Sequence, residues 1–259
     1  MEAEFTRDGL VFEEIPQVIL SRDLGAMTLA AVSPGSVIAE EFRGLGARIR
    51  AIGDERPFQC VGLVSALAGE GKTTMAIGVA AALAREPGRR VLLVEADVRK
   101  PAMDEYLGMR GASGLGEWLL AGSARVPVRR LSPLGFSLLS AGLTHLKEPE
   151  LVGSKQMARL LESARRVFEF VVVDCPPLLP VADAVMMQDF LDGFLLVIRA
   201  RKSPLEAIQR AVATLKPGRI QGAVLNDQRD LIPSYYRYAY PHYREYGYGR
   251  GYGKDVDKG

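Results

Sequence analysis

The chain has 259 residues, of which 48% are hydrophobic and 25% charged, so its composition predicts a globular domain and excludes disordered and fibrous classes. Its 33 basic and 31 acidic residues give a formal net charge of +2, which argues against a general nucleic-acid binder. Cys60 and Cys175 are too few for a disulfide framework, and we expect both to be reduced core residues.

The start of the chain, MEAEFTRDGL, is polar and acidic where a signal peptide would be basic and then apolar. No stretch reaches the roughly 20 apolar residues that a membrane span needs. The sequence therefore predicts a soluble, cytoplasmic protein.

Strand-like and helix-like runs alternate along the chain. The strand-like runs are continuously apolar, as in strands buried on both faces; they cover Phe58–Ser65, Arg90–Glu95, Phe136–Ser140, Phe170–Asp174, Gly193–Arg199 and Ile220–Leu225. The predicted helices cover Val37–Ile52, Thr73–Arg85, Ser154–Phe168, Ala182–Phe190 and Ser203–Leu215. This alternation predicts an α/β fold with a doubly wound, mainly parallel sheet.

The composition changes after the last predicted strand, near Asn226–Arg229. Residues 233–253 read PSYYRYAYPHYREYGYGRGYG, with little aliphatic content to form a core, so we expect a flexible segment. The predicted organisation is an N-terminal arm (1–33), a P-loop domain (34–228) and a tyrosine-rich tail (229–259).

The strongest motif is Ala66-Leu-Ala-Gly-Glu-Gly-Lys-Thr73, a P-loop pattern between a predicted strand and a predicted helix. Gly69 and Gly71 let backbone N–H groups converge on phosphate oxygens at a helix N-terminus. Lys72 can reach the β and γ phosphates, and Thr73 can offer its hydroxyl to Mg²⁺. The alternative is a glycine-rich turn without a ligand. The predicted nucleotide-binding residues here are Ala68, Gly69, Glu70, Gly71, Lys72, Thr73 and Thr74.

Acidic residues end two of the predicted strands. Phe170-Val-Val-Val-Asp174 is a Walker B pattern, in which Asp174 would hold Mg²⁺ directly or through a water. Val91-Leu-Leu-Val-Glu95-Ala-Asp97 ends in two carboxylates, which suggest a further acidic ligand or base near the γ-phosphate. A strand-end cap and a loop of ordinary charges are the alternatives.

Together these motifs resemble those of the bacterial tyrosine kinases of capsule and exopolysaccharide assembly (BY-kinases), which share a P-loop branch with the MinD and ParA ATPases. The matching elements are the Walker A sequence Ala68-Gly-Glu-Gly-Lys-Thr73, the Walker A′ sequence Glu95-Ala-Asp97-Val-Arg99, and Asp174-Cys-Pro-Pro177 with Asp183 downstream. The family's tyrosine cluster has its counterpart in Tyr235, Tyr236, Tyr238, Tyr240, Tyr243, Tyr246, Tyr248 and Tyr252.

The chain departs from the family pattern at three places. Glu95 replaces the first Walker A′ aspartate, so its carboxylate reaches about 1.5 Å further, and this change in geometry can alter activity. Ala68 replaces the loop proline. In the ring-forming helix motif E-x-x-R-x-x-R, Glu40 and Arg43 are present but Gly46 stands at the second arginine, which puts ring formation in question.

The resemblance implies a protein-tyrosine kinase that phosphorylates its own tail or a sister chain's and regulates polysaccharide synthesis and export. It implies ATP on the P-loop, Mg²⁺ held by Thr73, Asp97 and Asp174, and Glu95 or Asp97 as acceptor of the tyrosine proton. Asn226 would contact the adenine, and a membrane polysaccharide co-polymerase would recruit and activate the kinase at the inner face of the membrane.

Two alternatives stay open. A MinD/ParA-like ATPase would hydrolyse ATP without phosphorylating protein, although the second P-loop lysine of that class is missing here and the tyrosine cluster would be unexplained. A nucleotide-binding regulator would have lost transfer activity through Glu95.

Overall fold

The computed structural model describes residues 4–5, 9–17, 33, 36–109, 111–131, 134–143 and 149–227. The chain divides into a unit of residues 1–226 and a second unit of residues 227–259. The whole predicted tail (229–259), with its eight tyrosines, lies outside the described residues. The account of the fold therefore concerns the first unit.

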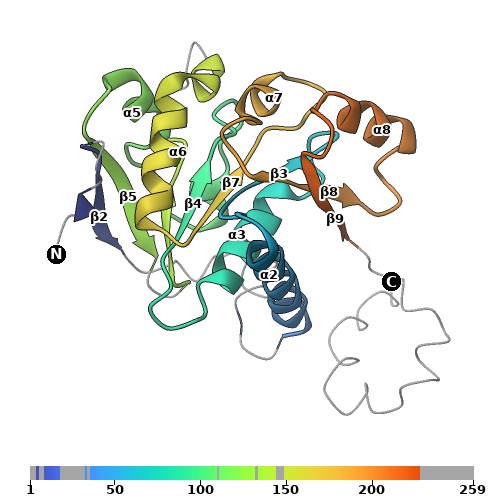
Figure 1. Cartoon of the computed structure of the whole chain (residues 1–259), viewed down its shortest axis with the longest axis horizontal. Coiled ribbons are helices and arrows are strands. Elements are labelled where there is room, and N and C mark those ends of the chain that lie inside the picture. Colours follow the sequence, from blue (N-terminus) through green and yellow to red (C-terminus); the bar gives the residue numbers. More distant parts are fainter. Residues whose placement is uncertain are drawn as a thin grey trace, which may run out of the picture. The chain divides into compact units, whose positions relative to one another are not determined.

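One mostly parallel sheet forms the centre of this unit (Figure 1). Within the described residues it has nine strands in the order β1-β2-β5-β6-β4-β7-β3-β8-β9. Neighbouring strands are parallel except at β1–β2 and β5–β6, which confirms the predicted fold class. The strands are β1 (Glu4–Phe5), β2 (Val11–Gln17), β3 (Cys60–Ser65), β4 (Val91–Glu95), β5 (Arg125–Leu131), β6 (Phe136–Leu139), β7 (Phe170–Asp174), β8 (Gly193–Arg199) and β9 (Ile220–Asn226).

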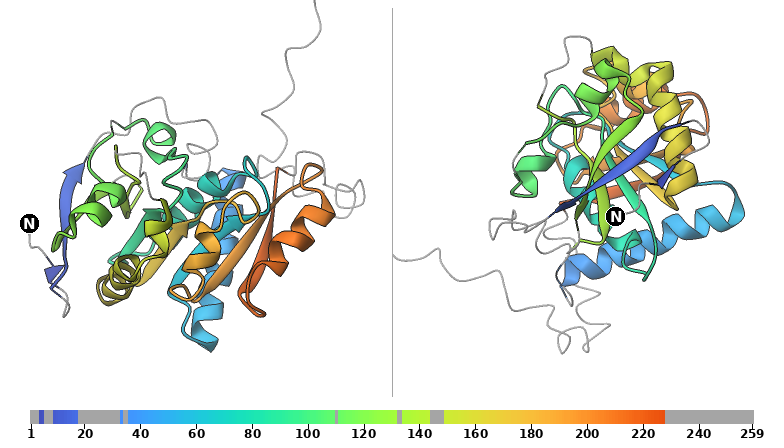
Figure 2. Two further views of the ribbon diagram at one scale, coloured as in Figure 1. Left: turned by 90° about the horizontal axis from the view of Figure 1, so that it is seen from above. Right: turned by 90° about the vertical axis from the view of Figure 1, so that its left-hand side faces the viewer.

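Helices cover both faces of the sheet, as the two views of Figure 2 show. One face packs against α2 (Val37–Glu55), α3 (Lys72–Leu83) and the short α4 (Met103–Tyr106). The other packs against α5 (Leu115–Ala121), α6 (Lys155–Val167), α7 (Asp183–Met187) and α8 (Leu205–Ala213), with the 3-10 turn η1 (Pro149–Gly153) before α6. Because both faces are covered, every residue of β3 and β4 is buried, as continuous apolar runs predict.

Helix α2 packs closely on α3 through small residues. Its N-terminus is capped by Ser36, whose Oγ accepts a hydrogen bond from Ala39 N at 3.0 Å. The Phe42 ring lies against Gly78 of α3, where a Cβ atom would collide with it. On the same helix Glu40 and Arg43 form an ion pair with each other. Any role of this pair in assembly remains a prediction.

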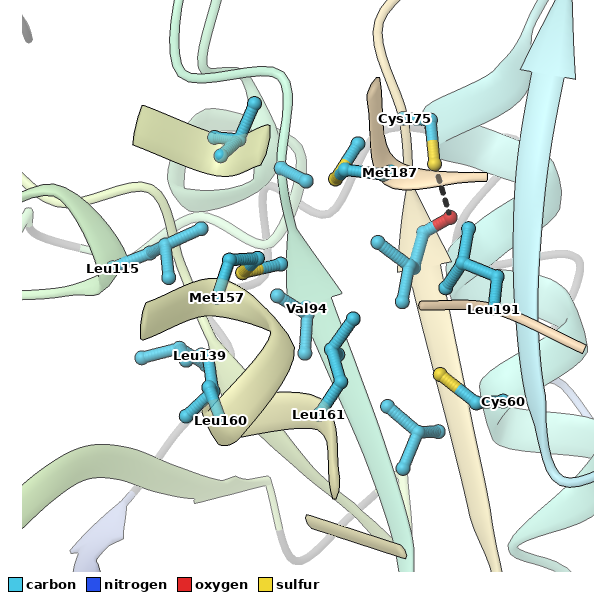
Figure 3. Close-up of a cluster of buried hydrophobic side chains, with 14 of the residues drawn as sticks. Cys60, Val94, Leu115, Leu139, Met157, Leu160, Leu161, Cys175, Met187 and Leu191 are labelled. Carbon is cyan, nitrogen blue, oxygen red and sulfur yellow. Dashed lines mark hydrogen bonds between the residues drawn. The ribbon is translucent and has the colours of Figure 1, made fainter. Parts of the chain in front are cut away.

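The core between the sheet and α6 is mainly apolar around β4 and β7. Figure 3 shows Met157, Leu160 and Leu161 of α6 beside Val94 of β4. Cys60 and Cys175 are free and buried, which confirms their prediction as reduced core residues. Burial raises the pKa of the Cys60 thiol to about 12, so this thiol is unreactive at neutral pH.

The sheet also contains a strand from the predicted N-terminal arm. Strand β2 pairs in parallel with β5, and its Phe12 is buried, with its ring edge-on to Phe168 at a centroid distance of 5.4 Å. Strand β5 and the short helices α4 and α5 are further elements that the sequence patterns did not predict. Among the helices of the described residues, none combines the length and hydropathy that crossing a bilayer requires.

Candidate functional site

Three neighbouring parallel strands bring the predicted site residues to one edge of the sheet. Strand β7 lies between β3 and β4, and Asp174 pairs with Leu63 on one side and with Glu95 on the other. Because parallel strands end at the same edge, the P-loop after β3 and the acids that end β7 and β4 converge there. The structure thus brings together the three motifs that the sequence predicted to form one site.

The two glycines of the P-loop have backbone conformations that other residues rarely adopt. Gly69 and Gly71 have φ angles of +78° and +92°, values that favour glycine. Gly71 is also the residue before α3, and no side chain caps that helix. The first N–H groups of α3 are therefore available to an anion, and the positive end of the helix dipole favours one. Lys72, the first residue of α3, is 7% exposed.

The Glu70 carboxylate forms hydrogen bonds within the P-loop and to the segment after β8. Its Oε2 accepts a hydrogen bond from Leu67 N at 3.0 Å, and its Oε1 accepts one from the Ser203 hydroxyl in the connection between β8 and α8. The side chain is consequently buried, with 4% exposure. Any contribution of Glu70 to nucleotide binding through its backbone N–H remains a prediction.

Two side chains from the ends of β8 and β9 bind P-loop carbonyls. Arg199 Nη1 donates to Gly69 O at 3.2 Å, and Asn226 Nδ2 donates to Glu70 O at 2.9 Å. Fixing these carbonyls fixes the peptide planes of the loop, and with them the directions of its N–H groups. A Cβ atom at Gly71 would also collide with the Asn226 amide. The structure thus gives Asn226 a role in holding the loop, and its predicted adenine contact stays a prediction.

Asp174 and Thr73 form the polar centre of the site. Thr73 Oγ1 donates to Asp174 Oδ2 at 2.7 Å. Asp174 is 1% exposed, and its Oδ1 is buried without a hydrogen-bond partner. Burial raises the pKa of Asp174 to about 7, against the lowering effects of the Thr73 hydrogen bond and of Lys72. A buried carboxylate oxygen without a partner beside a threonine hydroxyl fits a hard cation that prefers oxygen ligands.

Asp97 lies two residues beyond β4 and is half-buried. Its Oδ1 accepts a hydrogen bond from Lys100 N at 3.2 Å. Burial raises the pKa of Asp97, and the charge of Lys72 opposes this effect. Asp97 therefore lies close enough to Lys72 for their charges to interact.

An ion pair connects the Walker A′ segment to the start of α7. Arg99 Nε lies 2.7 Å from Asp183 Oδ2, and Arg99 Nη2 donates to Asp183 Oδ1 at 3.1 Å. The Asp183 side chain is 2% exposed, so this two-point pair is partly desolvated. It links the segment that carries Asp97 to the segment that follows Asp174.

Glu95 is turned toward the backbone. Its Oε1 accepts hydrogen bonds from Ala102 N at 2.6 Å and Met103 N at 2.8 Å, and its Oε2 accepts one from Ala141 N at 2.9 Å. Burial raises the pKa of this carboxyl group, although the three hydrogen bonds partly oppose the effect. The predicted role of Glu95 as proton acceptor remains a prediction.

The described residues contain no group of three or more His, Cys, Asp or Glu side chains arranged to hold a metal. This is compatible with Mg²⁺, which commonly takes one or two protein oxygens and completes its shell with phosphate oxygens and water. The arrangement can bind a phosphate chain at α3 and one cation beside Asp174.

Sequence reasoning missed the functional contacts of Ser203 and Arg199. Arg199 ends a predicted strand and Ser203 begins a predicted helix, and neither pattern indicates a contact with a loop about 130 residues away. Only the pairing of β8 with β3 places their side chains beside the P-loop.

Comparisons with known proteins identify the family of this chain. A family description of the ATPase MipZ matches residues 60–188. The tyrosine-protein kinase YwqD of Bacillus subtilis (strain 168) is 32% identical over 214 residues, which cover 81% of this chain and 90% of that protein. The succinoglycan biosynthesis transport protein ExoP of Rhizobium meliloti (strain 1021) is 33% identical over 86% of this chain, which spans only 28% of that longer protein.

Among solved structures, the kinase domain of the Escherichia coli tyrosine kinase ETK superposes with a TM-score of 0.71 and 25% identity, covering 81% of this chain and 84% of that domain. The sequence identity to YwqD extends over most of the length of that protein, and the P-loop and the two acidic strand ends are the motifs expected of such a kinase. The chain therefore belongs to the bacterial tyrosine-protein kinases, which carry the P-loop ATPase fold.

Proposed function

We propose that this chain uses ATP and Mg²⁺ to phosphorylate tyrosines of its own tail or of a sister chain's tail, and so regulates capsular or exopolysaccharide synthesis and export. The observation that carries the proposal is the buried, unpartnered Oδ1 of Asp174, next to the Thr73 hydroxyl and below the P-loop. A carboxylate in this state is suited to a cation that arrives with a phosphate chain.

The phosphates would be held by the backbone N–H groups of residues 68–74 and by the Lys72 ammonium group. The uncapped N-terminus of α3 and the positive φ angles of Gly69 and Gly71 support this phosphate position. Mg²⁺ would be held by Thr73, Asp97 and Asp174, and when bound it would neutralise phosphate charge. The protein's own contribution is to position the phosphates and to stabilise negative charge with Lys72.

The acceptors would be the eight tyrosines from Tyr235 to Tyr252. A tail with little aliphatic content can present several hydroxyl groups to one site in turn. Each phosphate adds about 1.5 to 2 negative charges. Successive phosphorylation would therefore weaken the attraction of the tail to a site that contains acidic groups and a bound nucleotide.

The partner would be a membrane polysaccharide co-polymerase whose cytoplasmic segment activates the kinase and recruits it to the inner face of the membrane. The support is ExoP, in which the region similar to this chain belongs to a longer transport protein. Contact between sister chains through the helix that carries Glu40 and Arg43 belongs to the same proposal, and no nucleic-acid partner is expected.

Mass spectrometry of the full chain, incubated with ATP, Mg²⁺ and a cytoplasmic fragment of the co-polymerase, tests the proposal. We expect phosphotyrosine between Tyr235 and Tyr252, and its loss in Lys72→Met. Phosphotyrosine that persists in Lys72→Met would identify a contaminating kinase. Magnesium-dependent nucleotide binding without tyrosine phosphorylation would favour the nucleotide-binding regulator. Steady ATP hydrolysis without tyrosine phosphorylation would favour the MinD/ParA-like ATPase.

A further inference from the structure

The Glu95 side chain connects the two ends of the segment that carries Asp97. This segment leaves β4 at Glu95 and reaches α4 at Met103, and the carboxylate at its start binds the backbone N–H groups of Ala102 and Met103 at its end. Ala96 N also donates to Asp174 O at 2.9 Å, so the first peptide of the segment is held by the neighbouring strand. The position of Asp97 between these two attachments is thus restricted.

The second oxygen of Glu95 attaches the same segment to the end of β6, through Ala141 N. A neighbouring cluster holds the same two elements together. Buried Arg129 donates to Ser140 Oγ at 2.7 Å and pairs with Asp104 of α4. Glu95 and Arg129 therefore jointly fix α4 against the end of β6.

These hydrogen bonds depend on the length of the Glu95 side chain. Its three donor–acceptor distances of 2.6, 2.8 and 2.9 Å are already normal, so a carboxylate about 1.5 Å shorter could not keep all three without movement of the backbone. The side chain is 2% exposed. The three backbone hydrogen bonds use three of the roughly four acceptor positions of the carboxylate.

We propose that Glu95 is a positioning residue: through three backbone hydrogen bonds it holds the segment that carries Asp97, and it is not the acceptor of the tyrosine proton. This inference rests on the proposed kinase function. The tyrosine oxygen forms a bond to the γ-phosphorus while the bond from that phosphorus to the β–γ bridging oxygen breaks, and ADP leaves with the electron pair. The phenolic proton goes to solvent water and not to Glu95, whose side chain is 2% exposed.

The test measures phosphorylation of a synthetic peptide with the sequence of residues 233–253 by the full chain. Glu95→Gln, Asp97→Asn and the control Glu117→Gln are compared for kcat and for the KM of ATP. Glu117 is a matched control because it too accepts backbone hydrogen bonds, from Gly114 N at 2.8 Å and Leu143 N at 2.9 Å, but on α5. Amide hydrogen exchange at residues 102, 103 and 141 is measured in the wild type, in Glu95→Gln and in Glu95→Ala.

We expect Glu95→Gln to lower kcat less than about tenfold and to raise the KM of ATP, because the segment that carries Asp97 is loosened. Asp97→Asn should lower kcat by more than Glu95→Gln does, because Asp97 is one of the proposed magnesium ligands. Exchange at these amides should be faster in Glu95→Ala, and Glu117→Gln should leave both kinetic constants near the wild-type values.

A loss of a hundredfold or more in kcat in Glu95→Gln, with wild-type exchange at the three amides, would overturn the inference and identify Glu95 as the proton acceptor. A wild type that phosphorylates no tyrosine contradicts the proposed function instead. In that case unchanged exchange in Glu95→Ala would overturn the positioning role of Glu95 independently, and faster exchange would support it.

Discussion

Replacing Asp174 by asparagine should stabilise the nucleotide-free protein while it removes magnesium-dependent nucleotide binding. Asp174 is 1% exposed, and one of its oxygens has no hydrogen-bond partner. Its ionised form is therefore poorly solvated in the fold. Asparagine has nearly the same shape, can still accept the Thr73 hydrogen bond and carries no charge.

The expected gain in stability depends on pH. Burial raises the pKa of Asp174 from 3.8 to about 7, so the folded protein binds the proton more tightly than the unfolded chain does. The stability that protonated Asp174 contributes is complete below about pH 4 and is lost as the pH rises through about 7. At pH 8 this loss amounts to about 4 kcal/mol. An unpaired amide in the variant would offset about 1–2 kcal/mol, which leaves a net gain of about 2–3 kcal/mol.

Urea unfolding of the wild type and Asp174→Asn at pH 4, 6 and 8, without nucleotide or Mg²⁺, measures the effect. At pH 4 the variant should be about 1–2 kcal/mol less stable than the wild type because of the unpaired amide, and it should become the more stable protein as the pH rises. With saturating ATP and Mg²⁺ the wild type should gain about 3 kcal/mol at a hundredfold excess over Kd, and the variant should gain little. Equal pH dependence of the two proteins would refute the reasoning.

The remaining predictions concern the contacts around the site. Asn226→Ala should raise the Kd of ATP about tenfold, since an unsatisfied Glu70 carbonyl costs about 1–3 kcal/mol. Fluorescence titration measures this Kd, which should be unchanged in the control Leu225→Ala. An equal change in the Kd of both variants would contradict the role of Asn226. Arg99→Ala should lower the free energy of unfolding by about 1–3 kcal/mol because it leaves the buried Asp183 carboxylate unpaired. Adding Asp183→Asn should restore part of this loss in urea unfolding, and an additive double mutant would show that the pair contributes nothing.

Much of the fold follows from apolar periodicity. Strands β7 and β8 have the predicted bounds, because their runs of Val, Leu, Ile and Phe are continuous and end at charged residues. Strand β5 was not predicted because its sequence, RVPVRRL, contains a proline and three arginines. One of these, Arg129, is buried and has Asp104 and Ser140 among its partners, and the sequence pattern cannot show such partners.

The parts of the site that come from contiguous sequence motifs were predictable. The P-loop, Asp174 and Asp97 are each indicated by a motif at the end of a strand, and parallel pairing brings them together. The direction of the Glu95 side chain and the contacts of Ser203 and Arg199 with the P-loop depend on distant segments. These contacts span 46, 133 and 130 residues, and a sequence motif does not encode them.

Isothermal titration calorimetry of ATP into the full chain, with Mg²⁺ and with a chelator in its place, tests the central claim most directly. The account predicts saturable binding of ATP with Mg²⁺ to the wild type, much weaker binding with the chelator, and loss of binding in Lys72→Met. Absence of magnesium-dependent binding at millimolar ATP, or equal binding by Lys72→Met, would contradict it.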